Sequence, residues 1–495
     1  MQLNDETHQL TCISFNHLGT YTSVATPSNV ALYSISPEKD PLLSSSIPLS
    51  NVISTQHLFE TPISVSLLRV STKETLYADQ DGPRALLHQD REMERIFYDL
   101  LLTNITTQQN YPRWRFEDEV VDVKCNQKHF VVFFRSYFLV FDFAKECPVV
   151  LFELPAELLS ASNTDLTAFN QKPFRSETTC PVSSVAFPVS NSSGHVCVQN
   201  LSDAFLSSFL SLIDPSAVTT DTWVDTFELE RQSRLGQTLG TGETTVKRID
   251  RSKIPSILVN ENEPHNEQDR WIFRAHNSPI RILRFSRDGS LLATGSDKVS
   301  LLPSERCPVF FASFPLQGTT IRIFSPSRHC QRYELHRSSV GRQARLSSFA
   351  FSSSNKLFAV SSNTPTVHLF SLLSPPQKTW FGKIWGNTNK FLSTVTGNSA
   401  PKPSSDLTPE QKQAQDTPET PVAMEHAATI RLKTDPDGKV PETLLSFVDE
   451  KGHDDHHHLF IATSSPELLS YDIIVDKTLK VTELGERSLL SSQYS

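Results

Sequence analysis

The feature that most constrains the fold is a unit that recurs along the whole chain. In each copy an alternating apolar stretch is followed by a turn of the Asn/Asp-x-x-Gly or Asp-Gly type, and a second β-rich stretch follows. Each copy ends in a strand with an aromatic residue and a polar cap. Alternation broken by turn residues is typical of antiparallel strands. Repetition of one such unit is typical of a β-propeller.

Six copies are recognisable, and a seventh is degenerate. The six cover residues 10–35, 120–143, 182–201, 280–298 continued at 319–325, 346–372 and 444–473. The seventh is placed between Val52 and Thr106, where apolar stretches occur without turn signals. We therefore expect an all-β fold, a WD40-like propeller of seven blades with long disordered loop insertions. It should span residues 1–476 and be followed by a C-terminal tail at 477–495.

Three segments interrupt the pattern. Residues 203–270 are polar and mixed in charge, which predicts a surface loop that is mostly disordered or locally helical. Residues 374–427 are rich in Pro, Ser, Thr and Gln and form a long excursion from one blade. Residues 299–317 contain no turn signal, and removing them joins their flanks into a hairpin with a glycine turn. We hypothesise that this third segment is a retained intron, because valine codons begin with GT and a glutamine codon can be CAG.

Composition narrows the classes of function. No run of eighteen apolar residues occurs, the first ten residues are polar, and the seven cysteines form no CxxC pair, which indicates an intracellular protein in a reducing compartment. The net charge of −9 argues against nucleic acid as a partner. No phosphate-binding loop and no catalytic or metal-ligating arrangement can be identified. We therefore predict no enzyme activity, no cofactor and no metal.

Several stretches resemble the PROPPIN family, autophagy-linked propellers that bind polyphosphoinositides. The most similar are AHNSPIRILRFSRDGSLLATGSDK, GTTIRIFS and SSNTPTVHLFSL, and the resemblance is strongest from His276 to Leu372. The resemblance implies membranes that contain phosphoinositides and autophagy proteins as partners, and a chain that is monomeric when soluble. It also implies a cytoplasmic protein that lies peripherally on phagophore or endolysosomal membranes.

The family signature, Phe/Leu-Arg-Arg-Gly, corresponds here to Leu335-His336-Arg337-Ser338. His336 replaces the first arginine and Arg337 matches the second, and in the family each arginine serves a different one of two neighbouring lipid sites. The resemblance therefore implies one weakened or pH-dependent site. An inositol phosphate needs several cationic and hydroxyl donors, and the planar guanidinium matches phosphate geometry.

The resemblance also assigns further residues to the two sites. The second site would use Arg337 with Ser361 or Ser362, Thr366 and His368, although a lysine that the family often has near Thr364 is missing. The first site would use Ser296, Lys298, Thr319, Arg322 and His336. Thr366 and His368 are two residues apart and share one face of a strand. The alternative is that these polar side chains only satisfy backbone groups at the propeller rim.

The segment 374–427 is the membrane-insertion loop of blade 6 by the same resemblance. Its apolar residues are Trp380, Phe381, Ile384, Trp385, Phe391 and Leu392. Spacings of three and four place several of them on one helical face, with lysines between them, and such a face suits a lipid headgroup interface. The alternative is that these aromatic residues pack against the propeller.

Two functions follow from the sequence. The first is a propeller that docks on membranes containing phosphatidylinositol 3-phosphate or phosphatidylinositol 3,5-bisphosphate and recruits partners in autophagy. The alternative is a WD40-like scaffold for protein interactions that has lost one or both lipid sites, which the broken arginine pair favours.

Overall fold

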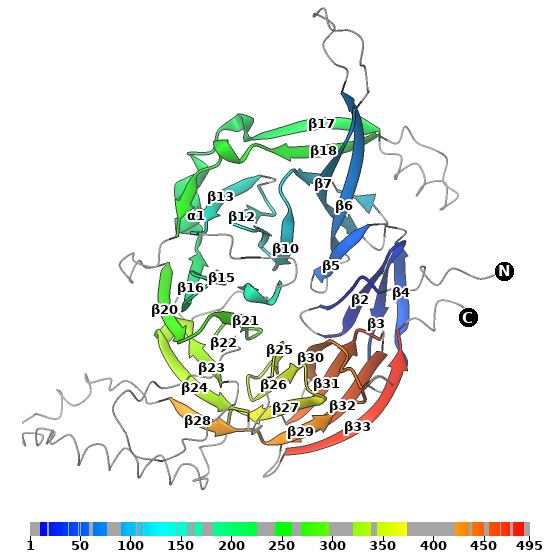
Figure 1. Cartoon of the computed structure of the whole chain (residues 1–495), viewed down its shortest axis with the longest axis vertical. Coiled ribbons are helices and arrows are strands. Elements are labelled where there is room, and N and C mark those ends of the chain that lie inside the picture. Colours follow the sequence, from blue (N-terminus) through cyan, green and yellow to red (C-terminus); the bar gives the residue numbers. More distant parts are fainter. Residues whose placement is uncertain are drawn as a thin grey trace, which may run out of the picture.

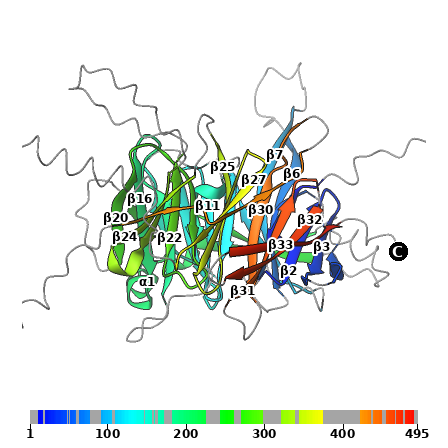
Figure 2. The same ribbon diagram turned by 90° about the horizontal axis from the view of Figure 1, so that it is seen from below.

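The described part of the chain forms a closed ring of seven sheets in the computed structural model, and the pairing within them is mainly antiparallel (Figure 1). The ring is a flat disc, and the view from its side shows strands running between the two faces of the disc (Figure 2). The fold predicted from the repeats is therefore confirmed. The structure describes residues 10–16, 19–37, 39–47, 49, 51–58, 63–76, 91–104, 107, 109–111, 113–145, 147–155, 159, 164–170, 182–224, 243–259, 269–296, 320–337, 344–373, 421–434, 438–449, 455–465, 467–475 and 479–489.

Blades 1 to 4 contain the first half of the strands. Blade 1 has the order β1-β2-β3-β4, blade 3 begins β10-β11-β12-β13, and blade 4 has the order β14-β15-β16-β20. Blade 2 runs β5-β6-β7-β9, and β8 pairs with β7. The bounds are β1 Cys12–Phe15, β2 Tyr21–Thr26, β3 Asn29–Ser34, β4 Leu42–Ile47, β5 Val52–Leu58, β6 Ile63–Leu76, β7 Arg91–Asn104, β8 Gln109–Asn110, β9 Arg113–Phe116, β10 Val120–Cys125, β11 His129–Phe134, β12 Tyr137–Asp142, β13 Pro148–Glu153, β14 Ala168–Phe169, β15 Ser183–Pro188, β16 Gly194–Leu201 and β20 Arg270–His276.

Blades 5 to 7 complete the ring. Blade 5 begins β21-β22-β23-β24, blade 6 has the order β25-β26-β27-β29, and blade 7 has the order β30-β31-β32-β33. The degenerate seventh repeat at 52–106 is blade 2, so each predicted repeat corresponds to one blade. The bounds are β21 Ile280–Phe285, β22 Leu292–Ser296, β23 Thr320–Ser325, β24 Cys330–His336, β25 Leu346–Phe351, β26 Leu357–Ser362, β27 Thr366–Ser371, β29 Ala428–Arg431, β30 Thr443–Asp449, β31 His456–Thr463, β32 Glu467–Val475 and β33 Leu479–Ser488.

The turn residues of the repeat form one recurring hairpin turn. Gly19 donates its backbone N–H to the Asn16 carbonyl (3.0 Å), and Gly289 donates in the same way to Ser286 (3.0 Å). Both glycines have a positive φ, of 68° and 75°, which a side chain would strain. The Asn16 side chain also accepts from the backbone N–H of Tyr21 (3.0 Å). Local turn chemistry therefore sets the register of the first hairpin in these blades.

The described strands of blade 1 all come from the N-terminal part of the chain, and those of blade 7 all come from the C-terminal part. The ring is therefore closed by side-chain contacts between these two blades. Val24, Tyr33 and Phe460 belong to one buried apolar cluster that spans the two blades. Arg487 of β33 donates to the carbonyl oxygens of Ser36 (2.9 Å) and Pro37 (3.0 Å). Burial of each large apolar side chain stabilises such a seam by about 1.5–3 kcal/mol.

The surface loop expected at 203–270, mostly disordered or locally helical, contains local helix and also strands where the structure describes it. It contains a helix, α1 (Asp203–Leu210), which is followed by two 3-10 turns and three strands, and it returns to blade 4 at β20. The Ser202 hydroxyl caps α1 by accepting from the backbone N–H of Phe205 (3.1 Å). The elements after α1 are η3 Pro215–Ala217, β17 Val218–Val224, β18 Glu243–Ile249, η4 Arg251–Lys253 and β19 Ser256–Leu258.

These strands extend blades that precede them in the chain. β18 pairs in parallel with β9, and β17 pairs with β18, so both join blade 2. β19 pairs in parallel with β13 of blade 3. β28 (Val422–Glu425) pairs in parallel with β24 of blade 5, and it lies in the segment predicted as the excursion from blade 6. Sequence patterns did not predict these strands, because pairing between distant segments leaves no local signature.

Two other predicted boundaries fall near described strands. β33 is the outer strand of blade 7, so the propeller extends through Ser488 and the boundary predicted at residue 476 is wrong. Residues 299–317 lie outside the described residues. β22 and β23 on either side of them pair directly, with Gly295 opposite Ile321. The retained intron stays a prediction.

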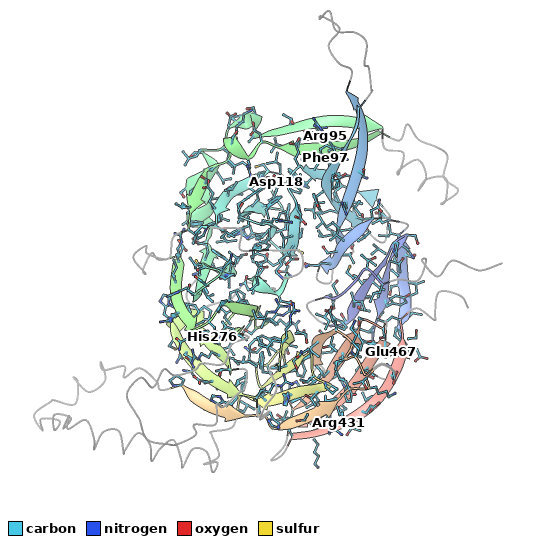
Figure 3. All side chains as sticks on the ribbon, viewed as in Figure 1. Arg95, Phe97, Asp118, His276, Arg431 and Glu467 are labelled. Carbon is cyan, nitrogen blue, oxygen red and sulfur yellow. The ribbon has the colours of Figure 1, made fainter. Side chains whose placement is uncertain are left out.

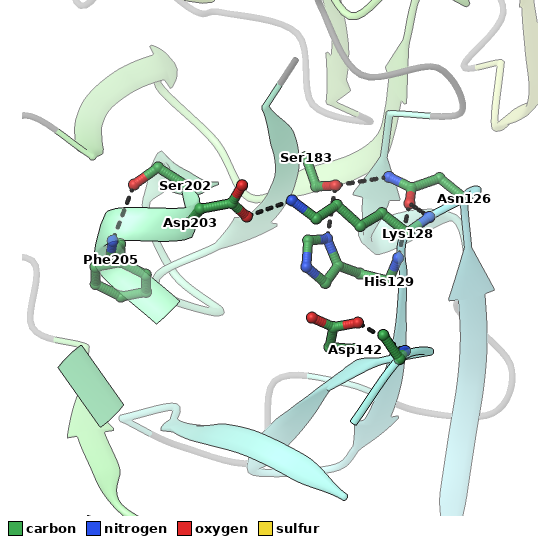
Figure 4. Close-up of polar contacts among 9 residues, drawn as sticks. Asn126, Lys128, His129, Asp142, Ser183, Ser202, Asp203 and Phe205 are labelled. Carbon is green, nitrogen blue, oxygen red and sulfur yellow. Dashed lines mark hydrogen bonds and ion pairs between the residues drawn. The ribbon is translucent and has the colours of Figure 1, made fainter. Parts of the chain in front are cut away.

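A buried polar junction joins blades 3 and 4 (Figure 4). Ser183 Oγ lies 2.8 Å from His129 Nδ1 and accepts from Asn126 Nδ2 (3.0 Å). Ser183 and His129 are each 1% exposed, and burial lowers the pKa of His129 to about 4. Asp142 accepts from the backbone N–H of Ala144 (2.8 Å). The inaccessibility of Ser183 makes this cluster a structural tie between two blades.

Candidate functional site

Arg337 follows β24 directly and extends from blade 5 to blade 6. Its Nη1 donates to Ser362 Oγ (2.5 Å), and its Nη2 donates to Thr364 Oγ1 and to Thr366 Oγ1 (3.3 Å). The three hydroxyls come from the end of β26, the following turn and the start of β27. The guanidinium is therefore held at the ends of strands in two neighbouring blades, near the outer edge of the ring.

A row of hydrogen bonds continues from Arg337 along β27. Thr364 Oγ1 lies 3.0 Å from Thr366 Oγ1, which lies 3.3 Å from His368 Nε2. The ring of His426, which stands between β28 and β29, meets the His368 ring edge-on with centroids 4.9 Å apart. Three segments that are distant in sequence thus contribute to one cluster, which we call the Arg337 cluster: Arg337, Ser362, Thr364, Thr366, His368 and His426.

The Arg337 cluster carries a buried cation that no described carboxylate neutralises. Arg337 is 2% exposed and His368 6% exposed. Among the described residues, none of the ion pairs within 4.0 Å involves Arg337. Burial lowers the pKa of Arg337 to about 10, and burial together with the charges of Arg337 and His426 lowers the pKa of His368 to about 4.

Three buried nitrogens of the cluster have no hydrogen-bond partner in the described part of the chain. They are Arg337 Nε, His368 Nδ1 and His426 Nδ1. A buried polar atom without a partner costs about 1–3 kcal/mol, so native proteins rarely leave one unsatisfied. One such nitrogen in the guanidinium and two in the neighbouring histidine rings indicate a site that an external hydrogen-bonding group could complete.

The structure brings together most of the residues predicted for the second lipid site. Arg337, Ser362, Thr366 and His368 are in one cluster, whereas Ser361 points to the other face of β26 and lies 3.2 Å from Ser347 Oγ. The alternation of the strand therefore decides between Ser361 and Ser362.

Two members of the cluster were missed by sequence reasoning. The resemblance marks Thr364 only as the place of a missing lysine, although its short spacing from Thr366 could have identified it. His426 gave no signal, because it returns to the site after the excursion from blade 6 and is positioned by the pairing of β28 with β24.

The residues predicted for the first site are engaged differently. Arg322 of β23 lies opposite Glu334 of β24, with Arg322 Nε 3.2 Å from Glu334 Oε2. Its Nη1 donates to the carbonyl oxygen of Ala275 (2.6 Å). His276, at the end of β20 (Figure 3), lies 2.8 Å from Thr294 Oγ1. Burial and the charge of Arg322 lower the pKa of His276 to about 3.

The remaining first-site residues do not form a comparable cluster. His336 has a side chain that is 51% exposed and lies 3.6 Å from Glu334 Oε1. Ser296 is buried and accepts from Ser278 Oγ (3.4 Å). Lys298 and Thr319 lie outside the described residues. Glu334 therefore faces both Arg322 and His336, the two residues that the resemblance assigned to an anion.

The predicted membrane-insertion residues, Trp380 to Leu392, lie outside the described residues, but both ends of their segment are described. Tyr333 Oη donates to the carbonyl oxygen of Leu372 (3.2 Å), and Tyr333 is paired with Val422. The segment therefore leaves and returns beside Tyr333. Thr366, which contacts Arg337, is at the opposite end of β27, and six residues of strand span about 20 Å.

In the described part of the chain no helix is long and apolar enough to cross a bilayer.

Comparisons with known proteins agree with this architecture. Residues 62–375, more than half of the chain, match the family described as BCAS3, WD40 repeat. Curated relatives are named Autophagy-related protein 18: one from Phaeosphaeria nodorum is 33% identical over 139 residues, which is 28% of this chain and 28% of the relative. Another, from Yarrowia lipolytica, is 33% identical over 125 residues, which is 23% of this chain and 26% of the relative. The matched regions thus span little more than a quarter of these relatives.

A solved structure extends the likeness of fold to nearly the whole chain. Kluyveromyces lactis Hsv2 with a complete loop 6CD has a TM-score of 0.53 at 11% identity, with 97% of this chain and 99% of that chain covered. Fold, repeats and relatives together define a WD40-type seven-bladed β-propeller. The chain belongs to the BCAS3 WD40-repeat family, and its resemblance to the PROPPINs is confirmed by the relatives named Autophagy-related protein 18.

Proposed function

We propose that the Arg337 cluster binds the phosphorylated headgroup of a phosphoinositide. The observation that carries this proposal is a buried guanidinium surrounded by hydroxyls, with three unsatisfied nitrogens and no described carboxylate beside it. A phosphate would supply both the missing charge and acceptors for Arg337 Nε and a histidine nitrogen. Charge-assisted hydrogen bonds of this kind contribute about 1.5–3 kcal/mol each.

The headgroup we propose is phosphatidylinositol 3-phosphate or phosphatidylinositol 3,5-bisphosphate, by analogy with the PROPPINs. The cluster offers one permanent cation and two imidazoles, Arg337, His368 and His426. A bound phosphate would favour proton uptake by the His368 imidazole, because a nearby negative charge raises its pKa. The site could therefore match the charge of either headgroup by taking up protons.

Membrane docking would add a second contact through the segment 374–427. Its apolar residues and the lysines between them suit the headgroup region, where each lysine contributes about 1 kcal/mol. The Arg337 cluster and the ends of the segment lie near opposite ends of β27, both at the outer edge of blades 5 and 6. Both can reach one bilayer only if the propeller presents its rim, so we propose edge-on docking with avidity from the two contacts.

The biological role we propose is recruitment rather than catalysis. The relatives named Autophagy-related protein 18 support a role in autophagy. The propeller would lie on phagophore or endolysosomal membranes and present its remaining surfaces to autophagy proteins. Neither reaction chemistry nor a cofactor is part of the proposal.

Vesicle flotation tests the proposal directly. We expect wild-type protein to float with vesicles that contain either phosphoinositide and to stay unbound with phosphatidylcholine vesicles. Arg337→Ala should weaken binding at least tenfold. Arg345→Ala is the matched control, because Arg345 is an exposed arginine at the start of blade 6 and its removal changes the net charge equally. Equal binding by wild type and Arg337→Ala would refute the proposed site.

A protein-interaction scaffold without lipid binding is the second candidate. The contact of Arg322 with Glu334 favours it, because an arginine that a carboxylate already neutralises is a poorer phosphate ligand. Wild-type protein that fails to float with both phosphoinositides would support the scaffold. Flotation lost only in Arg337→Ala would exclude it.

A further inference from the structure

The outer strands of three blades each pair with an extended segment donated from elsewhere in the chain. β18 lies on β9, β19 lies on β13, and β28 lies on β24. All three pairs are parallel, although the blades themselves are antiparallel. The rim of this propeller therefore binds extended segments in one recurring geometry, through the backbone groups that an outer strand leaves unpaired.

β20 is the outer strand of blade 4, between two blades that carry such an added strand. No described strand pairs with its outer edge. It has seven residues, whereas the outer strand β29 of blade 6 has four. β33 of blade 7 is also uncovered in the described part, but several exposed charged side chains protect that edge.

An aromatic stack adjoins the uncovered edge. The rings of Trp271 and Phe273 stack with centroids 3.8 Å apart, and His329 stacks on Trp271 at 5.0 Å. Phe324 of blade 5 lies 4.5 Å from Phe273. Trp271 and Phe273 are only partly buried. A strand added to β20 could pack alternate apolar side chains against them, as cross-strand aromatic pairs do.

The charges around this edge favour an acidic occupant. Arg274 of β20 is exposed, and Arg328 is exposed in the turn between β23 and β24. β28, which ends at Glu425 and follows Glu419 in the sequence, shows on β24 that an outer strand of this propeller accepts a segment of such composition. Opposite charges select partner and register more than they add affinity.

We propose that the outer edge of β20 binds an extended, acidic segment of a partner protein as an additional parallel strand. The carbonyl oxygen of Ala275 already accepts from Arg322, so the available edge runs from Trp271 to Arg274. This interaction is independent of lipid binding, because no member of the Arg337 cluster takes part in it. It would give the membrane-docked propeller a defined place for a partner.

The test uses the full-length chain and a fluorescent peptide with the sequence of residues 418–427, PETPVAMEHA. Fluorescence anisotropy gives the affinity, and hydrogen exchange gives the location. We expect binding that slows exchange in residues 270–276 and leaves residues 479–488 unchanged. A peptide with lysine at both glutamate positions, and one with proline in place of methionine, should each bind at least fivefold more weakly.

Protein variants complete the test. Arg274→Glu should weaken binding of the acidic peptide at least fivefold, whereas the matched reversal Arg345→Glu should change it less than twofold. Arg337→Ala should leave peptide binding intact, which separates this proposal from the lipid site. No binding, protection outside residues 270–276, or equal binding by Arg274→Glu would overturn the proposal. Slowed exchange at 270–276 without peptide, rising with protein concentration, would identify a second copy as the occupant and would also overturn it.

Discussion

Arg337 and Arg322 are two arginines at the same rim of the propeller, but their neighbours differ. Arg337 is 2% exposed and donates only to neutral hydroxyls. Arg322 is paired with Glu334 and donates to a backbone carbonyl. The difference teaches that residue type alone does not define an anion site. A cation is available to phosphate only where the fold has not already provided its negative partner.

The largest expected effect comes from replacing each arginine by methionine, which is similar in volume and uncharged. Arg337→Met should greatly weaken vesicle binding yet stabilise the fold by about 1 kcal/mol, because a buried and unneutralised charge is removed. The three hydroxyls would still have one another as partners, at 2.9 and 3.0 Å. Binding should fall at least tenfold in flotation, while urea unfolding should show the gain.

Arg322→Met is the other arm of the same experiment. It removes an ion pair and a hydrogen bond to a carbonyl, so it should destabilise the fold by about 1 kcal/mol and alter binding less than threefold. A loss of stability in Arg337→Met as large as that in Arg322→Met would show that the guanidinium of Arg337 is a structural group, and the comparison would fail.

The next effect is a pH dependence that belongs to His368. Its pKa is lowered to about 4, so the unfolded chain binds a proton below pH 6.5 that the folded chain does not. Stability is therefore complete above pH 6.5 and is lost as pH falls toward 4, by about 2 kcal/mol at pH 5 for this residue. In urea unfolding, His368→Gln should lose about 2 kcal/mol less than wild type between pH 7 and pH 5.

A bound headgroup should reverse this trend. Phosphate beside His368 stabilises the protonated imidazole, so a saturating soluble headgroup should protect wild-type protein more at pH 5 than at pH 7. His368→Gln should show no such increase. Equal protection of wild type at both pH values would show that the phosphate does not reach His368.

The serine pair on β26 gives a smaller effect and tests the face of the strand. Ser362→Ala removes an acceptor of Arg337 and should weaken vesicle binding about fivefold, because Arg337 loses part of its orientation. Ser361→Ala changes the neighbouring residue on the opposite face and should alter binding less than twofold. The two variants are compared by vesicle flotation. Weaker binding by Ser361→Ala than by Ser362→Ala would contradict the assignment of Ser362 to the face of β26 that meets Arg337.

Features of the fold and of the candidate site could be predicted from the sequence where they depend on contacts between residues close together in the chain. Alternation and turns located six blades, apolar stretches alone indicated the seventh, and the period of two placed Thr366 and His368 on one face. The ion pair between Arg322 and Glu334 was also within reach, because these residues face each other in one hairpin. His426, β17 to β19 and β28 were not predictable in this way, since parallel pairing joins segments separated by many residues and depends on the completed ring.

The smallest effect we expect is a gain at the weaker site. Glu334→Gln keeps the side-chain shape and removes the charge that faces Arg322 and His336, at 3.2 and 3.6 Å. The Arg322 guanidinium and the His336 ring would then both be available to phosphate, and vesicle binding should rise about threefold. The gain is modest because Arg322 stays bound to the carbonyl of Ala275. In the Arg337→Met background the same change should restore part of the lost binding. If it restores none, Glu334 is not what separates the two arginines, and the position of Arg322 against β20 must account for the difference.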